Sequence, residues 1–423
     1  MIELKMDEES LAVSGVNLKV VGVGGAGGNA VNSMIASSEL GAVQFIAANT
    51  DAQALTLSPA QYKIQLGKKI TKGLGAGSNP EVGRRAAEED LDAILDTLEN
   101  TDILFLTAGL GGGTGSGALP VIAHAARELG ILTVAIVTKP FLFEGKRRQK
   151  HAEEALKNVK QAVDTLIVVP NQRLLETADP KISMLNAFAL SNDILKQAIK
   201  GISDIITKAG HINVDFADVK TIMKDTGIAI MGIGRASGAD RARQAALRAI
   251  NSPLLENASI HGAKGVLINI TGNDDLELQE INEAASMVYD MVSPEANIIL
   301  GSVIDLSMGN DISVTVIATG LEERAVQTVQ TTTVSATTPT AALHKPIPAQ
   351  TADIMGSRQT QPMEAPVVAK TPETSAAVAP AAMAMEDVKF DMDDLDTPTF
   401  MRKKAETESS AVQDDAGQNE QQF

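Results

Sequence analysis

A glycine-rich segment placed directly after a buried strand is the feature that most constrains this chain. Residues 111–117 hold five glycines together with one threonine and one serine. They follow the apolar run 103–106 and precede a helical pattern over 118–129. Glycine lets a backbone approach a ligand closely, and the N–H groups at a helix start attract anions. The segment therefore predicts a phosphate-binding turn, although it lacks the lysine of the G-x-x-x-x-G-K-[ST] P-loop.

A second glycine cluster, 22–28, precedes a helical pattern over 30–35. The spacing from Gly22 to Gly27 matches the G-x-G-x-x-G fingerprint of dinucleotide-binding folds, and Asp51 lies about where their ribose-binding acid is expected. One dinucleotide needs only one pyrophosphate cradle, whereas this chain has two. Two such loops favour one mononucleotide with a long phosphate chain, and an NAD-dependent oxidoreductase is the alternative.

The composition excludes several classes of protein. Asp plus Glu is 53 and Lys plus Arg is 36 in 423 residues, so the net charge of -17 argues against nucleic-acid binding. Cysteine is absent, which excludes disulfides and thiolate metal sites. The first 15 residues hold no apolar core of a signal peptide, and no apolar run approaches the roughly 18 residues that span a bilayer. We expect a cytoplasmic protein without direct membrane insertion.

Apolar runs that alternate with helical patterns indicate an α/β fold. Their near-continuous apolarity is typical of parallel strands that are buried on both faces. We expect a parallel sheet with helices on both faces and ligand loops at its carboxyl edge. The expected strands are 18–23, 43–47, 103–106, 131–137 and 166–169.

Apolar positions spaced by three and four predict a long amphipathic helix over 191–208, ended by Gly210. A second region of strands and helices follows over about 222–320, and its last strand is 312–318. Residues rich in Thr, Ala, Pro, Val and Gln then predict a disordered linker, and apolar anchors beyond it predict a partner-binding peptide. The expected division is 1–16, 17–190, 191–210 (central helix), 211–322, 323–388 (linker), 389–404 (peptide) and 405–423 (acidic tail).

The motifs together resemble the FtsZ family, the bacterial tubulin-like cell-division GTPases, over about 18–320 and more weakly over 390–404. The run GGGTGSG is similar to the tubulin/FtsZ signature. The resemblance implies a GTP-binding domain joined by a central helix to a smaller α+β domain, and a GTP-dependent polymer that forms the division ring at the septum. Other segments in family order are 49–51, 73–77, 138–141, 143–148 and 213–218.

The resemblance also implies the nucleotide contacts. Glu144 and Arg148 would hold the ribose region, and a carboxylate or amide acceptor, Asp193 or Asn192, would select guanine. Phe188 would cover the base or, alternatively, be a core residue. Phosphates would be bound by Gly24, Gly25, Ala26, Gly27, Gly28, Asn29, Gly111, Gly112, Gly113, Thr114 and Gly115, with Ala76 and Gly77 over the terminal phosphate and Asp51 and Asn171 completing the site. Relatives often have glycine where Ala26 stands.

The expected hydrolytic residues Asn213, Asp215 and Asp218 follow the long helix. An 18-residue helix spans roughly 27 Å, so these carboxylates cannot reach the phosphates of their own subunit. The resemblance implies that they enter the site of the next subunit in a head-to-tail filament, with Mg²⁺ neutralising phosphate charge. A non-hydrolysing tubulin-like scaffold is the alternative, which the presence of both aspartates disfavours.

The resemblance implies partners as well. The chain would assemble with itself, bind GTP and GDP, and bind membrane adaptors and division regulators through 389–404. This would place it at the midcell division ring, on the inner face of the membrane. Thr397 stands where the family usually has isoleucine, and the tail 405–423 has no assigned role.

Overall fold

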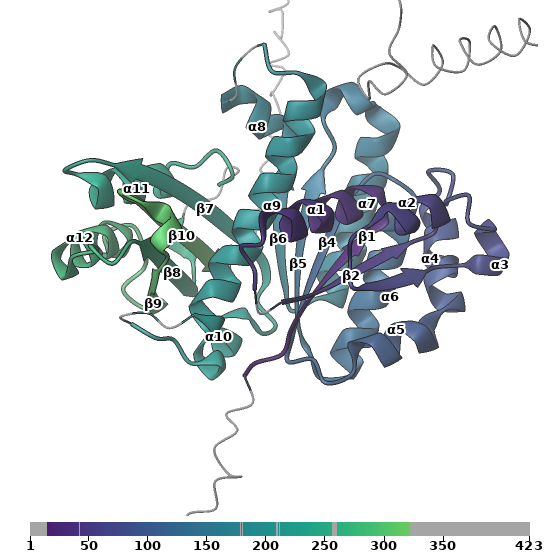
Figure 1. Ribbon diagram of the computed structural model, residues 1–423, viewed down its shortest axis with the longest axis horizontal. Helices are drawn as coiled ribbons and strands as arrows, with labels where there is room; N and C mark the ends of the chain where they lie inside the picture. The colour runs from purple at the N-terminus through teal and green to yellow at the C-terminus, as the bar shows by residue number, and fades with distance from the viewer. Residues whose placement is uncertain are drawn as a thin grey trace, which may run out of the picture. The chain divides into compact units, whose positions relative to one another are not determined.

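The computed structural model describes residues 15–41, 43–177, 179, 181–208, 210, 212–255 and 260–321 (Figure 1). The predicted linker, partner-binding peptide and acidic tail lie outside the described residues, as do residues 1–14. No helix in the described ranges combines the length and apolarity needed to cross a membrane.

In the described part of the chain, ten strands form one sheet in the order β3-β2-β1-β4-β5-β6-β7-β10-β8-β9. The pairs from β3 through to β7 are all parallel. The expected α/β class and the five expected strands are therefore confirmed; β1 has the expected bounds, and the bounds of the other four differ by a few residues. Their bounds are β1 (Leu18–Val23), β2 (Val43–Asn49), β3 (Tyr62–Gln65), β4 (Ile103–Gly109), β5 (Leu132–Lys139) and β6 (Thr165–Pro170).

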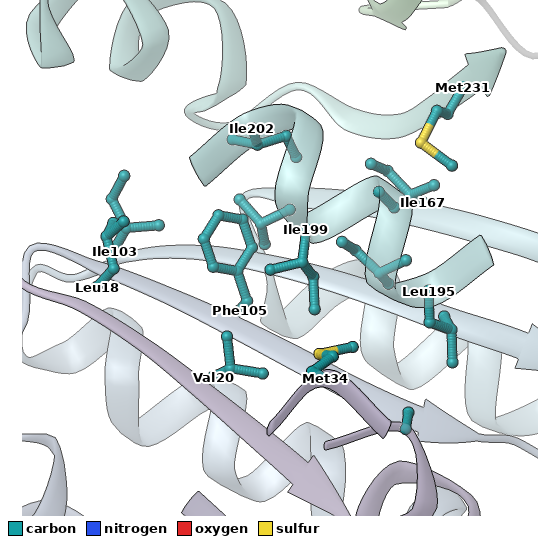
Figure 2. Close-up of a cluster of buried hydrophobic side chains, with 14 of the residues drawn as sticks. Leu18, Val20, Met34, Ile103, Phe105, Ile167, Leu195, Ile199, Ile202 and Met231 are labelled. Atoms are coloured by element: carbon teal, nitrogen blue, oxygen red, sulfur yellow. The ribbon is translucent and has the colours of Figure 1, made fainter. Parts of the chain in front are cut away.

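Alternating side chains of β1 enter two different cores, which explains why the strand is apolar throughout. Val20 packs with Met34, Phe105 and Ile199 on one face of the sheet (Figure 2). Val21 packs in the core on the other face. The helices of this half are α1 (Gly24–Ser37), α2 (Ala52–Leu57), α3 (Lys68–Thr71), α4 (Pro80–Glu89), α5 (Leu91–Leu98), α6 (Thr114–Glu128), the short η2 (Leu142–Glu144), α7 (Lys146–Ala162) and α8 (Asn171–Thr177).

The predicted helix starts were wrong in three places. Helix α1 begins at Gly24 rather than at residue 30, and α6 begins at Thr114 rather than at residue 118. Glycine has low helix propensity, so a sequence pattern assigns both first turns to loops. The long helix α9 (Met184–Thr207) has 24 residues and begins seven positions before 191, where the Ser183 side chain accepts a hydrogen bond from Asn186 N at 3.2 Å. Its first turn is mostly exposed and so lacks the apolar period.

The second half of the described chain extends the same sheet. Strand β7 pairs parallel with β6 over three residues, and β10 lies antiparallel between β7 and β8. A separate apolar core fills this half, as a smaller α+β unit requires. Its elements are α10 (Phe216–Met223), β7 (Gly227–Ser237), α11 (Arg241–Ile250), η3 (Ile260–Gly262), β8 (Gly265–Gly272), α12 (Leu278–Tyr289), β9 (Asn297–Ile304), η4 (Leu306–Met308) and β10 (Asp311–Thr319).

A partly buried ion network ties the end of α9 to this second half. Lys200 lies 2.8 Å from Asp204, which is almost completely buried, and 2.9 Å from Asp305 beyond β9. Lys208 approaches the same two carboxylates. Burial alone would raise the pKa of Asp305, but hydrogen bonds from Ser307 and Lys200 outweigh it and hold that pKa well below its usual range. The network therefore stabilises the position of the segment that follows α9.

Candidate functional site

The two glycine clusters contact each other at the carboxyl edge of the sheet. Gly22 of β1 lies beside Thr107 of β4 in the parallel register. A Cβ atom added to Gly27 would lie 2.3 Å from the carbonyl oxygen of Thr107, and one added to Gly24 would lie 2.9 Å from Gly115 N. No side chain fits at such distances. These glycines allow the two loops to form one continuous surface, as expected from the two strand-end motifs.

A third loop, between α3 and α4, packs on the glycine cluster 111–117. A Cβ on Gly113 would lie 2.8 Å from Ala76 Cβ and 2.9 Å from Asn79 N. The loop is held by a bridge between Asp51 and Leu74 and by a hydrogen bond from Gly75 N to Thr50 O at 3.3 Å. The fold therefore brings Ala76 against the glycine cluster 111–117, and Gly77 is the next residue of this loop.

Other glycines of the same loops face open space. No atom lies within 4 Å of a Cβ built on Gly25, Gly28, Gly75, Gly77 or Gly112. The two helices that begin in these loops, α1 and α6, have no side chain hydrogen-bonded at their N-caps. Their first N–H groups therefore keep their capacity to bind an acceptor. Open glycines beside two uncapped helix starts form a cradle suited to a chain of phosphates.

Two members of the glycine signature have structural roles. The Ser116 hydroxyl accepts a hydrogen bond from Gly111 N at 2.8 Å inside the protein. A Cβ on Gly117 would lie 1.9 Å from Pro80 O, so this glycine permits α6 to pack on α4. The Ala26 methyl, in turn, lies against Gly109, where a Cβ would come within 2.6 Å. Ala26 is thus accommodated because a glycine faces it.

Glu144 and Arg148 form an ion pair beside the glycine cluster 111–117. Arg148 Nη1 lies 2.7 Å from Glu144 Oε2, while Glu144 Oε1 accepts a hydrogen bond from Phe141 N at 2.9 Å. The backbone of Arg148 contacts Gly111, where a Cβ would lie 2.7 Å from Arg148 O. Both predicted ribose contacts therefore lie next to the phosphate cradle.

Asp51 is the N-cap of α2. Its Oδ1 atom accepts hydrogen bonds from Gln53 N at 2.9 Å and from Ala54 N at 3.2 Å. Thr50, its neighbour, shares a hydrogen bond of 2.7 Å with Thr114 of the glycine cluster 111–117. Asp51 thus has a local structural role at the rim of the site, and its Oδ2 atom has no hydrogen-bond partner within the described chain.

Phe188 is partly exposed and packs in an aromatic group rather than in the core. Its side chain is 37% exposed, and its ring meets those of Phe141 and Phe143 edge to face, with centroids 5.3 and 6.4 Å away. Phe141 and Phe143 stack at 5.0 Å. Phe141 is buried, whereas Phe143 is 59% exposed and is a further base-contact candidate that was not predicted from the sequence, although it adjoins Glu144.

The remaining base-contact candidates lie on α9 and at the end of β6. Asn171 is buried and accepts a hydrogen bond from Ser191 Oγ at 2.8 Å. Asn192 and Asp193 follow on the helix and are half-buried. Asp193 lies 3.1 Å from Lys196. Burial alone would lower the pKa of Lys196, but the carboxylates of Asp193 and Glu39 raise it above its ordinary value.

The predicted hydrolytic residues lie at the far end of α9. Asn213 and Asp215 make local hydrogen bonds, from Gly210 N to Asn213 Oδ1 at 2.8 Å and from Ala217 N to Asp215 Oδ1 at 3.2 Å. Asp218 is exposed in the first turn of α10. The other end of α10 reaches the amino edge of the sheet, because Thr165, the first residue of β6, donates a hydrogen bond to its last carbonyl group. The fold thus separates these carboxylates from the cradle at the carboxyl edge.

The described residues contain no group of three or more His, Asp or Glu side chains that could hold a metal ion. Mg²⁺ in nucleotide sites is commonly held by phosphate oxygens with one or two carboxylates. A magnesium ion here would therefore depend on the nucleotide for most of its ligands.

Two family models match the chain. Residues 17–179 match the Tubulin/FtsZ family, GTPase domain, and residues 227–322 match the FtsZ family, C-terminal domain. The curated cell division protein FtsZ of Pseudomonas putida is 46% identical over 92% of this chain and 97% of its own. The FtsZ of Azotobacter vinelandii is 47% identical over the same shares.

Solved structures of FtsZ and of a related protein resemble the described fold. An empty FtsZ dimer from M. jannaschii has a TM-score of 0.71 and 43% identity, covering 75% of this chain and 91% of that one. The GTPγS-bound protofilament of CetZ2 from Haloferax volcanii has a TM-score of 0.62, with 73% and 94% covered; at 22% identity it supports the fold alone. Three observations support the same assignment: the match over nearly the whole length, the two domains in family order and the phosphate cradle. The chain therefore belongs to the FtsZ family of tubulin-like GTPases.

Proposed function

We propose that this GTPase hydrolyses GTP at head-to-tail subunit junctions, where Asp215 and Asp218 of one subunit complete the nucleotide site of the next. The separation of these carboxylates from the phosphate cradle carries the proposal. Helix α9 has 24 residues and therefore spans about 36 Å. Phe188 lies near its start and Asp215 beyond its end. A water molecule at the cradle is out of reach of its own subunit's aspartates.

The chain is a GTP-dependent polymerising protein of cell division. A contact between the cradle face of one subunit and the α10 face of another joins two different surfaces. Such heterologous contacts continue from subunit to subunit and generate filaments. Assembly would then create each hydrolytic site, which couples filament growth to turnover.

The open glycines and the starts of α1 and α6 would bind the phosphates through backbone N–H groups, with Mg²⁺ neutralising their charge. Asp215 and Asp218 of the next subunit would orient and polarise the attacking water. Asn213 would support them indirectly, because its side chain holds the backbone at Gly210. Products would be GDP and phosphate.

Guanine would be read on α9. Its N1–H and N2–H₂ groups are donors, so Asp193 or Asn192 would accept them, whereas adenine would leave the acceptor unpaired. Phe188 and Phe143 would cover the base face, since both rings are exposed. Glu144 would accept from ribose hydroxyls, with Arg148 as a donor beside it.

The segment 389–404 is proposed to bind membrane adaptors and division regulators and so to hold filaments at the midcell ring. Its apolar residues Leu395, Phe400 and Met401 would serve as anchors in a partner groove. Thr397 stands where the family usually has an apolar isoleucine, and the loss of this anchor would weaken adaptor binding.

Complementation between two inactive variants tests the shared site. Asp218→Ala keeps the cradle but lacks the proposed water-orienting group, so GTP should bind while turnover falls by about 10²-fold or more. Gly112→Val places a side chain in the open space of the cradle and keeps Asp218. If the site is shared, mixing the two should restore phosphate release. In a random equimolar mixture, one junction in four combines an intact cradle with an intact Asp218.

Phosphate release per molecule should also rise steeply with protein concentration above an assembly threshold. A mixture no more active than its components, or a rate per molecule that stays constant down to dilute monomer, would exclude hydrolysis at junctions. Asp215→Ala in place of Asp218→Ala is the matched repeat, because both residues lie at the start of α10.

A further inference from the structure

A cluster of unpaired lysines marks one edge of the sheet. Strand β3 is the edge strand, and residues 52–80 around it contain four lysines and no acidic residue, in a chain whose net charge is -17. The side chains of this cluster, Lys63, Lys68, Lys69 and Lys72, are exposed. Within the described ranges, none of their ammonium groups lies within 4.0 Å of a carboxylate oxygen.

The nearest carboxylates are already used by the backbone. Glu89 Oε1 accepts a hydrogen bond from Lys69 N at 3.0 Å, and Asp90 Oδ2 accepts one from Gly67 N at 2.6 Å. Lys63 only reaches a carbonyl group, that of Thr56 at 3.4 Å. The four charges are therefore available to an acidic partner.

Apolar side chains are exposed beside these lysines. Leu57 is 82% exposed at the end of α2, Tyr62 is 43% exposed on β3, and Ile70 is 37% exposed on α3. Together with the four lysines they form a surface that we call the basic edge. The other basic run, 146–150, differs because Arg148 and Lys150 are in ion pairs and the run adjoins the nucleotide site.

We propose that the basic edge binds the acidic segment 386–396 of this chain, supplied by the same subunit or by a neighbour. The segment reads EDVKFDMDDLD, with six acidic residues and one lysine. Its apolar residues Phe390, Met392 and Leu395 stand among the aspartates, as the exposed Leu57, Tyr62 and Ile70 stand among the lysines. Charge and apolar character thus match on the two sides.

The chain between the described residues and the segment 386–396 is long enough for this contact. The described chain ends at Leu321, and 386 minus 321 leaves 65 residues, which span up to about 215 Å when extended. Binding would cover the acidic half of the segment 389–404 and leave the basic Arg402, Lys403 and Lys404 outside the contact. Occupation of the basic edge would therefore withhold half of this peptide from other proteins.

A labelled synthetic peptide of residues 385–397 tests the contact. The protein is the full chain with Asp391, Asp393, Asp394 and Asp396 changed to Asn, so that its own segment does not compete. It is kept in GDP, which makes the measurement independent of junction hydrolysis. Fluorescence anisotropy should show saturable binding that weakens with added salt.

Reversal of two charges should weaken peptide binding about tenfold or more, because attraction is replaced by repulsion. The variant is Lys68→Glu with Lys69→Glu. Its matched control is Lys157→Glu on α7, an exposed lysine with no ion pair in the described chain, which should change the affinity less than about twofold. Equal effects of the two variants, or no peptide binding at all, would overturn the proposal.

The complete chain offers a second measurement, because it has no tryptophan and only two tyrosines, Tyr62 and Tyr289. With Tyr289→Phe and Phe390→Trp, energy transfer from Tyr62 to the indole at position 390 should be observed and should fall with Lys68→Glu and Lys69→Glu. Transfer that persists on dilution indicates a contact within one chain, and transfer that is lost indicates a neighbour. Absence of transfer at every concentration contradicts the proposal.

Lysines on an edge strand can also serve only to hinder pairing with other sheets. If the lysines have only that role, the peptide should not change the aggregation of the Lys68→Glu and Lys69→Glu variant. The complete chain should then show no energy transfer. Sedimentation with phosphatidylserine vesicles separates the remaining case: vesicle binding that depends on Lys68 and Lys69, without peptide binding, would assign the basic edge to lipid and refute the proposal.

Discussion

Substitution by alanine should affect two adjacent glycines, Gly112 and Gly113, in different ways. A Cβ on Gly113 would lie 2.8 Å from Ala76 Cβ, whereas carbon atoms in contact are about 3.5–4.0 Å apart. The loop that carries Ala76 must therefore move by about 1 Å, and such overpacking costs about 1–3 kcal/mol. The backbone of Gly113 is helical, so Ala adds no strain of its own.

Gly112→Ala meets no atom within 4 Å, and the φ angle of Gly112 is not positive. The free energy of unfolding without nucleotide should change by less than about 0.5 kcal/mol. If phosphates occupy this open space, the methyl group should weaken GDP binding about tenfold or more. The stabilisation by saturating GDP should then fall by about 1.4 kcal/mol.

Urea unfolding of both variants and the parent, with and without GDP, measures the two effects separately. Gly113→Ala should lose stability in both conditions, and Gly112→Ala only in the presence of GDP. The parent protein under the same conditions provides the reference for each difference. If Gly112→Ala is stabilised by GDP as strongly as the parent, the open glycines do not face the nucleotide, and the assignment of the cradle is wrong.

Further predictions concern the ion network and the C-terminal segments. Lys200→Met should cost about 2–4 kcal/mol in urea unfolding, because it leaves the buried Asp204 with one fewer partner; a loss within error would contradict this. Because the folded-state pKa of Asp305 is depressed, its contribution to stability should be complete above its ordinary value of 3.8 and be lost as the pH falls below it, as acid unfolding can show. Deletion of 389–423 should leave GTP turnover intact and abolish binding to adaptor-coated vesicles, whereas residual vesicle binding would place the anchor elsewhere. Thr397→Ile should tighten adaptor binding by about 1 kcal/mol in a titration, the scale of one buried methylene, and no change would mean that this position is not a contact.

Strands and motifs were predictable from sequence because their signals are local. The five runs from 18–23 to 166–169 are apolar throughout because the sheet is covered on both faces, as Val20 and Val21 illustrate. The glycine signature, together with the other motifs, also indicated the family. The starts of α1, α6 and α9 were not predictable, because glycines and exposed first turns carry no apolar period.

The role of each glycine was decided only by tertiary structure. Gly112 and Gly113 are neighbours of the same residue type in the sequence. In the fold, however, Gly112 faces open space, whereas Gly113 contacts Ala76. Ser116 looks like a phosphate ligand in the motif but accepts a hydrogen bond inside its own loop. Such differences depend on which loop packs beside which, and a single sequence does not contain that information.

The sequence predicts two glycine loops and a pair of aspartates that are separated by a long helix. On which side of the molecule each of them lies follows from the packing of the fold. The parallel strands direct both glycine loops to the carboxyl edge of the sheet, whereas α10 reaches the amino edge through Thr165. Helix length sets the separation, but the packing of α9 against the sheet sets its direction, and that direction depends on contacts between residues far apart in the chain.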